Sequence, residues 1–304
     1  MNETSRETAP AGSAAGHAPL LVADSFRVRV NPRTGEAEVR GWNAHLERFT
    51  GSVLERMPEA AEREAEGRRL VEAACIERIE TFLEDSRNRI AAYGEGFPRL
   101  ELRAPERAGG DPELALSLRP LPELGSTIEL RTASGIRIDH PGVKGPNIAG
   151  FAELNRRLGA EALRLDAAGR AVEGATTSIV WWTDDDESGH IVGSPADGSV
   201  DRVDSVTEAL LEALVDEALL VDAAQGRLVG SKPGRRRSGA LAAARPTPEE
   251  LLRAEVWAVN ALHGIRVVTS IDGVAMRPPN ERRLRWFREA LERTWQPLRS
   301  PLGR

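Results

Sequence analysis

Residues 161–182 read EALRLDAAGRAVEGATTSIVWW and predict two strands joined by a turn. Apolar and β-branched residues fill both flanks, and the small residues and glycine of AAGR between them are typical of a turn. Glu173 stands at the end of an apolar run, directly before a glycine. Its carboxylate is either an ordinary surface group or part of a site. Of the two tryptophans that end the stretch, Trp181 and Trp182, we expect one to pack in the core and the other to be partly exposed.

Before this stretch, residues 140–147 read HPGVKGPN and contain Lys144, one of only two lysines among the 41 lysines and arginines of the chain. The other is Lys232. Arginine equals or exceeds lysine in salt bridges and phosphate binding, but it cannot lose its proton and attack a carbonyl group. A lysine kept in a loop of glycines and prolines is therefore a candidate for amine chemistry such as a Schiff base. The alternative is that two lysines survive by chance in a composition that disfavours them.

The rest of the chain alternates short strands with amphipathic helices. Residues 20–30 and the EVRGW segment predict a hairpin, and a helix begins near Asn43, a favourable N-cap residue. Helical spacing continues over 59–92 in two parts. Three extended runs between 97 and 133 predict an antiparallel sheet that completes a first domain. Further on we expect helices over 148–160, 205–220, 247–254 and 280–295, and two strands with a tight turn over 255–273. Residues 223–246 predict an arginine-rich loop, which is either solvated or in contact with a substrate phosphate.

These elements predict an α/β protein with a small α+β domain and a larger α/β domain. A chain of 304 residues is long enough for two such cores. We expect a disordered tail over 1–18, the small N-terminal domain over 19–135, an interdomain linker over 136–142 and the large domain over 143–304.

The composition argues against several classes of partner and site. A formal charge of −6 and a pI near 5.6 argue against nucleic acid or an anionic membrane as the main partner. Cys75 is the only cysteine, so neither an intrachain disulfide nor a cysteine-built metal site is possible, and we expect no metal. No apolar run approaches the roughly 20 residues of a membrane helix, and the first 18 residues lack the pattern of a signal peptide. We expect a cytoplasmic protein.

Two more short stretches could carry chemistry. AHLERF places His45 and Arg48 three residues apart on one helix face, where a surface pair is the simpler interpretation. DSVTEALL places Ser205, Val206 and Thr207 at the start of a helix, where free backbone N–H groups and a hydroxyl can bind an anion. A plain helix N-cap is the alternative there.

Taken together and in order, these stretches resemble the fold-type IV pyridoxal-phosphate enzymes, which include the branched-chain and D-amino-acid aminotransferases and aminodeoxychorismate lyase. The resemblance runs from about residue 22 to about residue 275 and is weakest in the first domain. Its most specific part is the 161–182 stretch, which is similar to the family pattern D-E-x-L-x-L-D-x-x-G-x-V-x-E-G. The resemblance implies two domains with the cofactor, pyridoxal 5′-phosphate, at their interface.

The family's motifs also imply roles for single residues. Lys144 would form the Schiff base, Arg48 would hold the cofactor phosphate and Glu173 would face the pyridine nitrogen. The chemistry requires these parts, because a Schiff-base lysine must be near neutral, a carboxylate keeps the ring nitrogen protonated, and a phosphate needs an arginine and helix-start N–H groups. By the same motifs, Val206 and Thr207 would lie in a phosphate-binding turn, and Ala261 and Leu262 in the turn whose backbone N–H groups bind phosphate and substrate carboxylate.

The sequence departs from the family pattern at several places. The tyrosine that follows the lysine in the aminotransferases is absent, since Tyr93 is the only tyrosine of the chain and Asn147 is the nearest polar residue that could replace it. Glu208 stands where the family usually has arginine. The later turn reads N-A-L, as in the lyases, without the usual threonine. The first-domain signature G-D-G-x-F-E-T is reduced to VADSFRV. Weak candidates for substrate contact are Ser25, Asn147 and Asn260.

Three functions follow from the resemblance and its departures. The first is a class IV aminotransferase-like enzyme that moves an amino group between an amino acid and a 2-oxo acid through a Lys144 Schiff base. The second is an aminodeoxychorismate lyase-type elimination that releases pyruvate, favoured by K-x-x-N and N-A-L. The third is a relative that binds the cofactor without turnover, since the tyrosine and threonine are missing. The family implies a homodimer and a small-molecule substrate whose identity the residues do not show.

Overall fold

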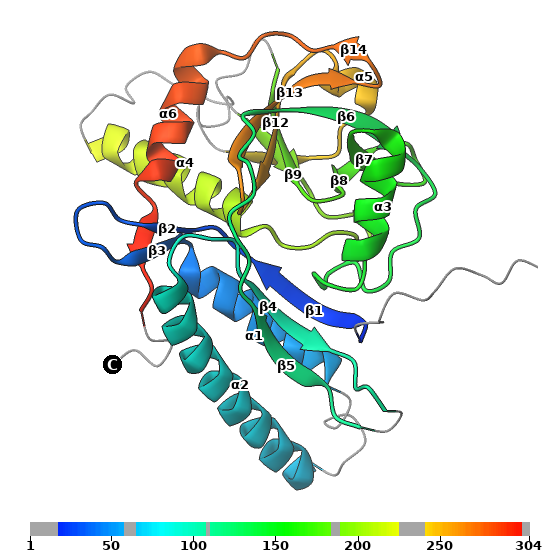
Figure 1. Cartoon of the computed structure of the whole chain (residues 1–304). Helices are drawn as coiled ribbons and strands as arrows, with labels where there is room; N and C mark the ends of the chain where they lie inside the picture. The colour runs from blue at the N-terminus through cyan, green and yellow to red at the C-terminus, as the bar shows by residue number, and fades with distance from the viewer. Residues whose placement is uncertain (1–17, 58–64, 108–109, 184–188, 225–240, 300–304) are drawn as a thin grey trace, which may run out of the picture.

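The computed structural model of the chain has a small part, drawn in the lower half of Figure 1, and a large part above it. The structure describes residues 18–57, 65–107, 110–183, 189–224 and 241–299. The predicted N-terminal tail, except residue 18, and most of the predicted arginine-rich loop lie outside these ranges. The small part is built from the N-terminal region and one strand from the C-terminal end, and the large part is built on a single sheet.

The small part contains two three-stranded antiparallel sheets and two helices. One sheet has the order β1–β4–β5, with α1 in contact with β1, and α2 in contact with α1 and β5. The other is the predicted hairpin of β2 and β3, extended on the β3 side by β15. Phe26, Trp42 and Phe49 are buried in the core of this part. The bounds are β1 Leu20–Ser25, β2 Val28–Val30, β3 Ala37–Arg40, α1 Trp42–Arg56, α2 Ala65–Tyr93, β4 Arg99–Arg103, β5 Glu113–Ser117 and β15 Trp295–Pro297.

Helix α1 begins differently from the prediction. Its N-cap is Gly41, whose φ of 64° lies in the left-handed region that glycine adopts without strain. Asn43 lies inside the first turn, so its expected capping role is wrong. A Cβ at Gly41 would lie 2.7 Å from Val206 Cγ1, which shows how closely the start of α1 approaches the large part. The helix predicted in two parts over 59–92 is continuous as α2 where the structure describes it.

The large part is a nine-stranded mixed sheet that curls until its ends meet. The order is β11–β10–β9–β12–β13–β6–β7–β8, with β14 paired to β13. At the two ends of this order, the Ala171 N–H of β8 donates to Pro246 O, just after β11, at 2.7 Å. The bounds are β6 Thr127–Ala133, α3 Ile148–Leu158, β7 Glu161–Leu165, β8 Ala171–Gly174, β9 Ser178–Trp182, β10 His190–Val192, α4 Val206–Ala224, β11 Ala242–Ala244, α5 Pro248–Leu251, β12 Glu255–Asn260, β13 Gly264–Ile271, β14 Val274–Ala275 and α6 Glu281–Glu292.

Both faces of this sheet are buried, which explains why its strands are apolar runs instead of alternating patterns. Ile179 and Trp181 of β9 pack on one face with Leu251 of α5. Val180 and Trp182 lie on the opposite face, under α4 and α6, which contact each other and cross in Figure 1. The exposed fractions of Trp181 and Trp182 are 4% and 2%. The expectation that one of them is partly exposed is therefore wrong.

The deciding stretch, residues 161–182, forms three strands instead of two. β7 and β8 pair in antiparallel fashion around the predicted turn. β9 does not continue that pair but lies between β10 and β12. The stretch therefore contributes to two separated places of the curled sheet, and Glu173 lies on β8.

Strand β6 does not complete the first domain's sheet. It lies between β13 and β7 and runs parallel to both. The expectation of one antiparallel sheet over 97–133 is therefore wrong for this strand. The physical reason is that β6 buries its Leu130 side chain in the core of the large sheet. The domain limits stay a prediction. Two strands lie across them: β6 belongs to the large sheet and β15 to the small part.

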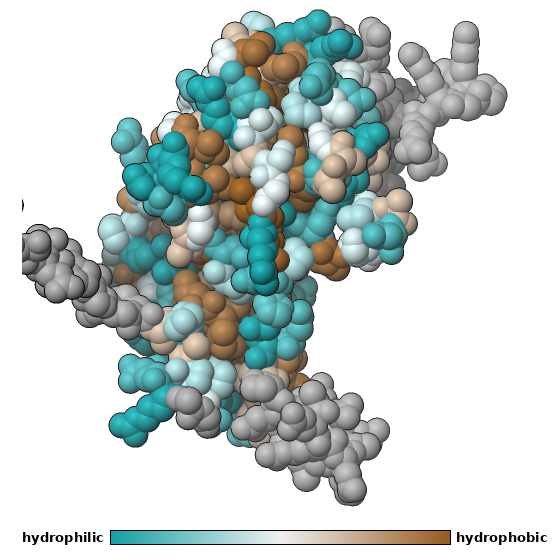
Figure 2. Space-filling model, turned by 90° about the vertical axis from the view of Figure 1, so that its right-hand side faces the viewer, coloured by the Kyte–Doolittle hydropathy of each residue, from teal (hydrophilic) through white to brown (hydrophobic). Residues whose placement is uncertain are grey.

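The surface drawn in Figure 2 is mixed, with hydrophobic residues interspersed among hydrophilic ones on both parts of the molecule. Within the described ranges, no helix combines the length and the apolar character needed to cross a membrane.

Candidate active site

A cavity of about 360 Å³ lies between the small part and the large sheet. Its walls come from β1 and α1 on one side and from β7, β8, β12 and the start of α4 on the other. All the residues that the sequence singled out line it: Ser25, Arg48, Lys144, Asn147, Glu173, Val206, Thr207, Asn260, Ala261 and Leu262. Among the described residues, no group of three or more His, Cys, Asp or Glu side chains could hold a metal ion.

Lys144 lies on a loop that packs directly against β1. The Ala23 N–H donates to Lys144 O at 2.6 Å. Gly145 has a φ of 146°, and a Cβ there would lie 2.8 Å from the β1 backbone, so only glycine fits this approach. The Asn147 side chain closes the loop, because its amide donates to Asp139 O at 2.7 Å and accepts from the Asp139 N–H at 3.1 Å.

The electrostatic surroundings bring the Lys144 amine toward neutrality. Burial, followed by the charge of Arg48, lowers the pKa of Lys144 to about 8, against the opposing charges of Asp24 and Glu173. A lysine with this pKa is partly deprotonated at neutral pH, and its nitrogen can then act as a nucleophile or a base.

Arg48 is held in a buried cluster with Asp24 and His45. Its Nε and Nη2 donate to the two Asp24 carboxylate oxygens at 2.8 and 2.9 Å, and its Nη1 donates to Asp204 O at 2.7 Å. His45 Nδ1 lies 2.7 Å from Asp24 Oδ1. The expectation of a surface pair of His45 and Arg48 is wrong, since His45 is 1% exposed. After these bonds the guanidinium retains one N–H on Nη1 and one on Nη2 for an anion in the cavity.

The charges of this cluster are interdependent. Burial acts to raise the pKa of the Asp24 carboxyl, but the charge of Arg48 and the hydrogen bond from His45 hold it well below its usual range. An ionised carboxylate only accepts hydrogen bonds, so the facing His45 Nδ1 must carry a proton. Burial also lowers the pKa of His45, which favours a neutral imidazole. Asp24 thus neutralises much of the Arg48 charge before any ligand binds.

The start of α4 adjoins Arg48. Val206 and Thr207 are buried there, and the Ser205 hydroxyl accepts from the Glu208 N–H at 3.3 Å, so Ser205 acts as an N-cap. The first N–H groups of a helix have no acceptor within the helix, and its N-terminus carries partial positive charge. Glu208 is paired with Arg202 at 2.7 Å. The helix start and Arg48 thus place N–H donors and positive charge at one corner of the cavity, which is the candidate anion-binding corner.

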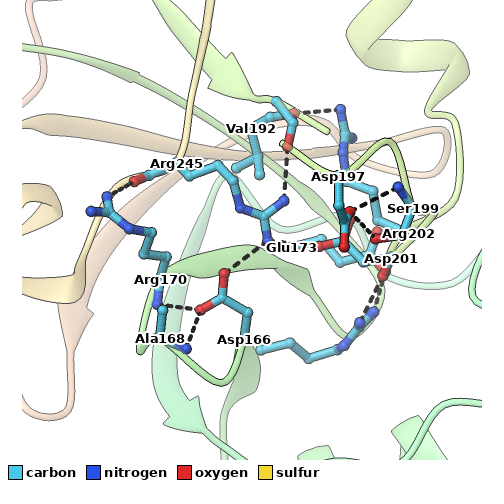
Figure 3. A network of polar contacts seen from close by, with 12 residues as sticks. Asp166, Ala168, Arg170, Glu173, Val192, Asp197, Ser199, Asp201, Arg202 and Arg245 are labelled. Carbon is cyan, nitrogen blue, oxygen red and sulfur yellow. Dashed lines mark hydrogen bonds and ion pairs between the residues drawn. The ribbon is translucent and has the colours of Figure 1, made fainter. Parts of the chain in front are cut away.

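Glu173 is paired with an arginine that the sequence analysis did not single out. Arg164 of β7 and Glu173 of β8 are direct partners in the strand register, and Arg164 Nη1 forms an ion pair with Glu173 Oε1. Burial raises the pKa of Glu173 to about 8, while the charges of Arg164 and Arg202 oppose the rise. Figure 3 shows the polar network around Glu173, in which Arg245 contacts both Asp201 and Asp166.

The turn after β12 is organised by the Asn260 side chain. Asn260 Oδ1 accepts from the backbone N–H groups of Leu262 at 3.2 Å and His263 at 2.9 Å. Its Nδ2 donates to Thr176 O at 3.3 Å. The N–H of Leu262 is therefore engaged within the turn and is not the free donor that we expected. The other expected donor is the Ala261 N–H. Among the turn and loop hydrogen bonds between described residues, this N–H donates none.

Comparison with known proteins identifies the fold. No family model and no curated protein matches the sequence. Solved structures do match: a T.th. branched-chain amino acid aminotransferase, complexed with N-(5′-phosphopyridoxyl)-L-glutamate, is 17% identical with a TM-score of 0.65, and the alignment covers 93% of this chain and 91% of that chain. The chain has the fold-type IV fold.

Two further fold-type IV structures agree. A hypothetical aminotransferase from Mycobacterium tuberculosis, in its alpha-ketoglutarate and PMP bound form, is 18% identical with a TM-score of 0.61 over 95% of both chains. The branched-chain aminotransferase of the archaeon Thermoproteus uzoniensis, with norvaline, is 17% identical with a TM-score of 0.59 over 91% of this chain and 90% of that chain. At such identities the likeness shows the fold.

Three residues in or beside this cavity were not predicted as site residues from the sequence. Asp24, which contacts Arg48, lies within the reduced VADSFRV signature, and Arg164 is a charged residue between two leucines of β7, which was a readable signal. Arg119 donates to the Ser25 hydroxyl at 3.1 Å and to Phe97 O at 3.0 Å. Nothing in the local pattern around Arg119 distinguished it from the other arginines of the chain.

Proposed function

We propose that the chain is a pyridoxal-phosphate-dependent, class IV aminotransferase-like enzyme that moves an amino group between an amino acid and a 2-oxo acid. The observation that carries this proposal is the position of Lys144 in one cavity with Arg48, Glu173 and the start of α4. This cavity offers a partner for three polar groups of the cofactor: an amine for the aldehyde, cationic donors for the phosphate and a carboxylate for the ring nitrogen. The residues present therefore fit pyridoxal phosphate.

Each residue has a distinct part in the proposed reaction. Pyridoxal phosphate supplies the electron sink for charge that develops at the substrate α-carbon. Lys144 binds the cofactor through its amine and later moves the proton at the substrate α-carbon. Arg48 binds the phosphate together with the N–H groups of Val206 and Thr207 at the start of α4. Glu173 holds the proton at the ring nitrogen, and the backbone at Ala261 binds the substrate carboxylate.

The finer predictions stay part of the proposal. An elimination that releases pyruvate is the alternative reaction, and binding without turnover is the third. Asn147 uses its amide to close the Lys144 loop and Asn260 uses its amide within its own turn, which limits both as substrate contacts. We also propose that the protein is cytoplasmic and, as the family resemblance implies, a homodimer. Light scattering after size exclusion tests the homodimer.

The first experiment is the visible absorption spectrum of the purified protein with pyridoxal phosphate. Lys144→Ala is compared with Lys232→Ala, the matched control, because these are the only two lysines. The proposal predicts a yellow protein-bound band that Lys144→Ala abolishes and Lys232→Ala retains. Borohydride reduction and peptide mapping then locate the covalent adduct. A colourless parent, or a band that survives Lys144→Ala, would contradict the proposal.

A second assay separates the three functions. Amino-acid donors are screened with and without a 2-oxo acid acceptor, and pyruvate is measured in parallel. An aminotransferase requires the acceptor, a lyase releases pyruvate without one, and an inert relative shows the bound cofactor unchanged by every donor.

A further inference from the structure

The carboxylate of Glu173 enters the cavity as half of an ion pair. Arg164 and Glu173 face each other directly across β7 and β8, where opposite residues of an antiparallel pair lie on the same face. Both side chains are buried and both line the cavity. Arg164 Nη1 contacts Oε1 of the carboxylate, whereas Oε2 makes no hydrogen bond to any described residue.

The Arg164 guanidinium is itself fixed by its surroundings. Its Nη2 donates to Asp201 O at 3.0 Å. The side chain of Asp201 is in turn held by Arg245 at 2.6 Å (Figure 3). On its remaining side, the Arg164 guanidinium carbon lies 5.5 Å from the centre of the Phe151 ring. The ion pair is therefore part of a built network and not a chance contact between mobile side chains.

The charges around Glu173 come from three elements. Arg164 belongs to β7, Lys144 to its own loop, and Asp201, Arg202 and Glu208 to the segment 201–208, which ends in the first turn of α4. Burial drives the carboxyl toward its protonated form, and among these groups Arg164 is the strongest opposing influence. A protonated carboxyl is a donor at one oxygen and cannot serve as the anionic acceptor for a ring N–H.

We propose that Arg164 is a positioning residue for Glu173: it binds Oε1, favours the carboxylate over the protonated carboxyl and so presents Oε2 to the protonated ring nitrogen of the cofactor. The inference rests on the proposed function, because only a bound pyridine ring gives Oε2 this partner. No proton changes owner in the arrangement. With the cofactor bound, the ring nitrogen holds its proton, Glu173 is the anion and Arg164 is a cation.

The test compares Arg164→Gln, which removes the charge but keeps a hydrogen-bond donor, with Arg164→Lys, which keeps the charge. Arg283→Gln is the matched control, because Arg283 is paired with the buried Glu255 away from the cavity. The pKa of Glu173 is measured in the cofactor-free protein by carbon NMR of labelled glutamate, assigned with Glu173→Gln. The dissociation constant of pyridoxal phosphate is measured from pH 6 to pH 9 by tryptophan fluorescence.

We expect Arg164→Gln to raise the pKa of Glu173 by about one unit or more and to weaken cofactor binding about tenfold at pH 7. The loss should shrink toward pH 9, where a larger fraction of the carboxyl is ionised even without Arg164, and Arg164→Lys should restore most of the binding. Arg283→Gln should lower the melting temperature without displacing the pH profile.

Two results would overturn the inference while leaving the proposed function in place. One is an unchanged pKa of Glu173 in Arg164→Gln. The other is cofactor binding weakened equally at every pH, which indicates a structural role alone. If the wild-type protein binds no pyridoxal phosphate at Lys144, the proposed function fails, and the inference fails with it.

Discussion

Asp24→Asn is the substitution whose effect follows most directly from the structure. The Asp24 side chain is 1% exposed and accepts hydrogen bonds from His45 and from two nitrogens of Arg48. Asparagine removes the negative charge and places an N–H₂ group where one of these donors now points. Breaking one side of a buried ion pair typically costs about 3–5 kcal/mol, because the remaining charge is left buried without a partner. We expect a loss of stability of this size.

This loss can be converted into a melting temperature. Unfolding entropy of about 2.1 cal/mol/K per residue gives about 0.6 kcal/mol/K for a chain of 304 residues. A loss of about 3–5 kcal/mol therefore lowers the melting temperature by about 5–8 °C. Calorimetry or fluorescence-monitored melting measures it. Asp85→Asn is the control, because Asp85 forms an exposed pair with Arg89 at 3.4 Å and surface pairs contribute little.

The same variant also tests the anion-binding corner. Without Asp24, the buried Arg48 guanidinium lacks its counter-charge, so an anion in the cavity should stabilise the variant more than the wild type. Inorganic phosphate and pyridoxal phosphate are the two probes. A melting temperature within about 2 °C of the wild type would refute the reasoning about the buried pair. A large loss that neither anion reduces more than in the wild type would place the phosphate site elsewhere.

Three further predictions concern the same region. Arg48→Ala should weaken retention of pyridoxal phosphate by about 10–100-fold, since charged hydrogen bonds contribute about 1.5–3 kcal/mol. Equilibrium dialysis measures this loss. The Asp24→Asn/Arg48→Ala double variant is the control, because it also removes the Asp24 carboxylate that Arg48→Ala alone leaves without its partner. Gly145→Ala should separate the Lys144 loop from β1, because the new Cβ would lie 2.8 Å from backbone atoms, and slower borohydride trapping at Lys144 with intact secondary structure is the expected result. Relative to His45→Gln, the wild type should lose additional stability in urea as the pH drops below about 6.5, because the folded pKa of His45 is lowered and the unfolded chain binds that proton first. The loss of stability below about pH 4 should be smaller in Asp24→Asn than in the wild type, because the folded pKa of Asp24 is also lowered.

Local features of the fold were predictable where neighbours in the sequence determine them. The β7–β8 turn, the β12–β13 turn and the capping box of Thr247 and Glu250 all have this property, and the structure contains each of them. Candidate site residues were predictable because their motifs are local as well. All of them line one cavity, although their roles stay proposals until the cofactor and its lysine are located.

Other features depend on which distant segment each residue meets. The apolar pattern of β6 suits either sheet, so its place between β13 and β7 could not be read from it. Trp182 is buried because α6 covers its face of the sheet, and α6 begins about a hundred residues later in the chain. The Asn260 side chain that accepts from the Leu262 N–H is also fixed by a distant segment, because its Nδ2 donates to Thr176 O.

The sequence by itself determined the local turns, the capping box of α5 and the set of chemically unusual residues, with Lys144 foremost among them. Only the tertiary structure decided the partners: Asp24 for Arg48, and Arg164 for Glu173. The physical reason is that turn and cap preferences arise from interactions within a few residues, whereas the charge state of a buried group depends on burial and on charges that strand pairing brings from elsewhere in the chain.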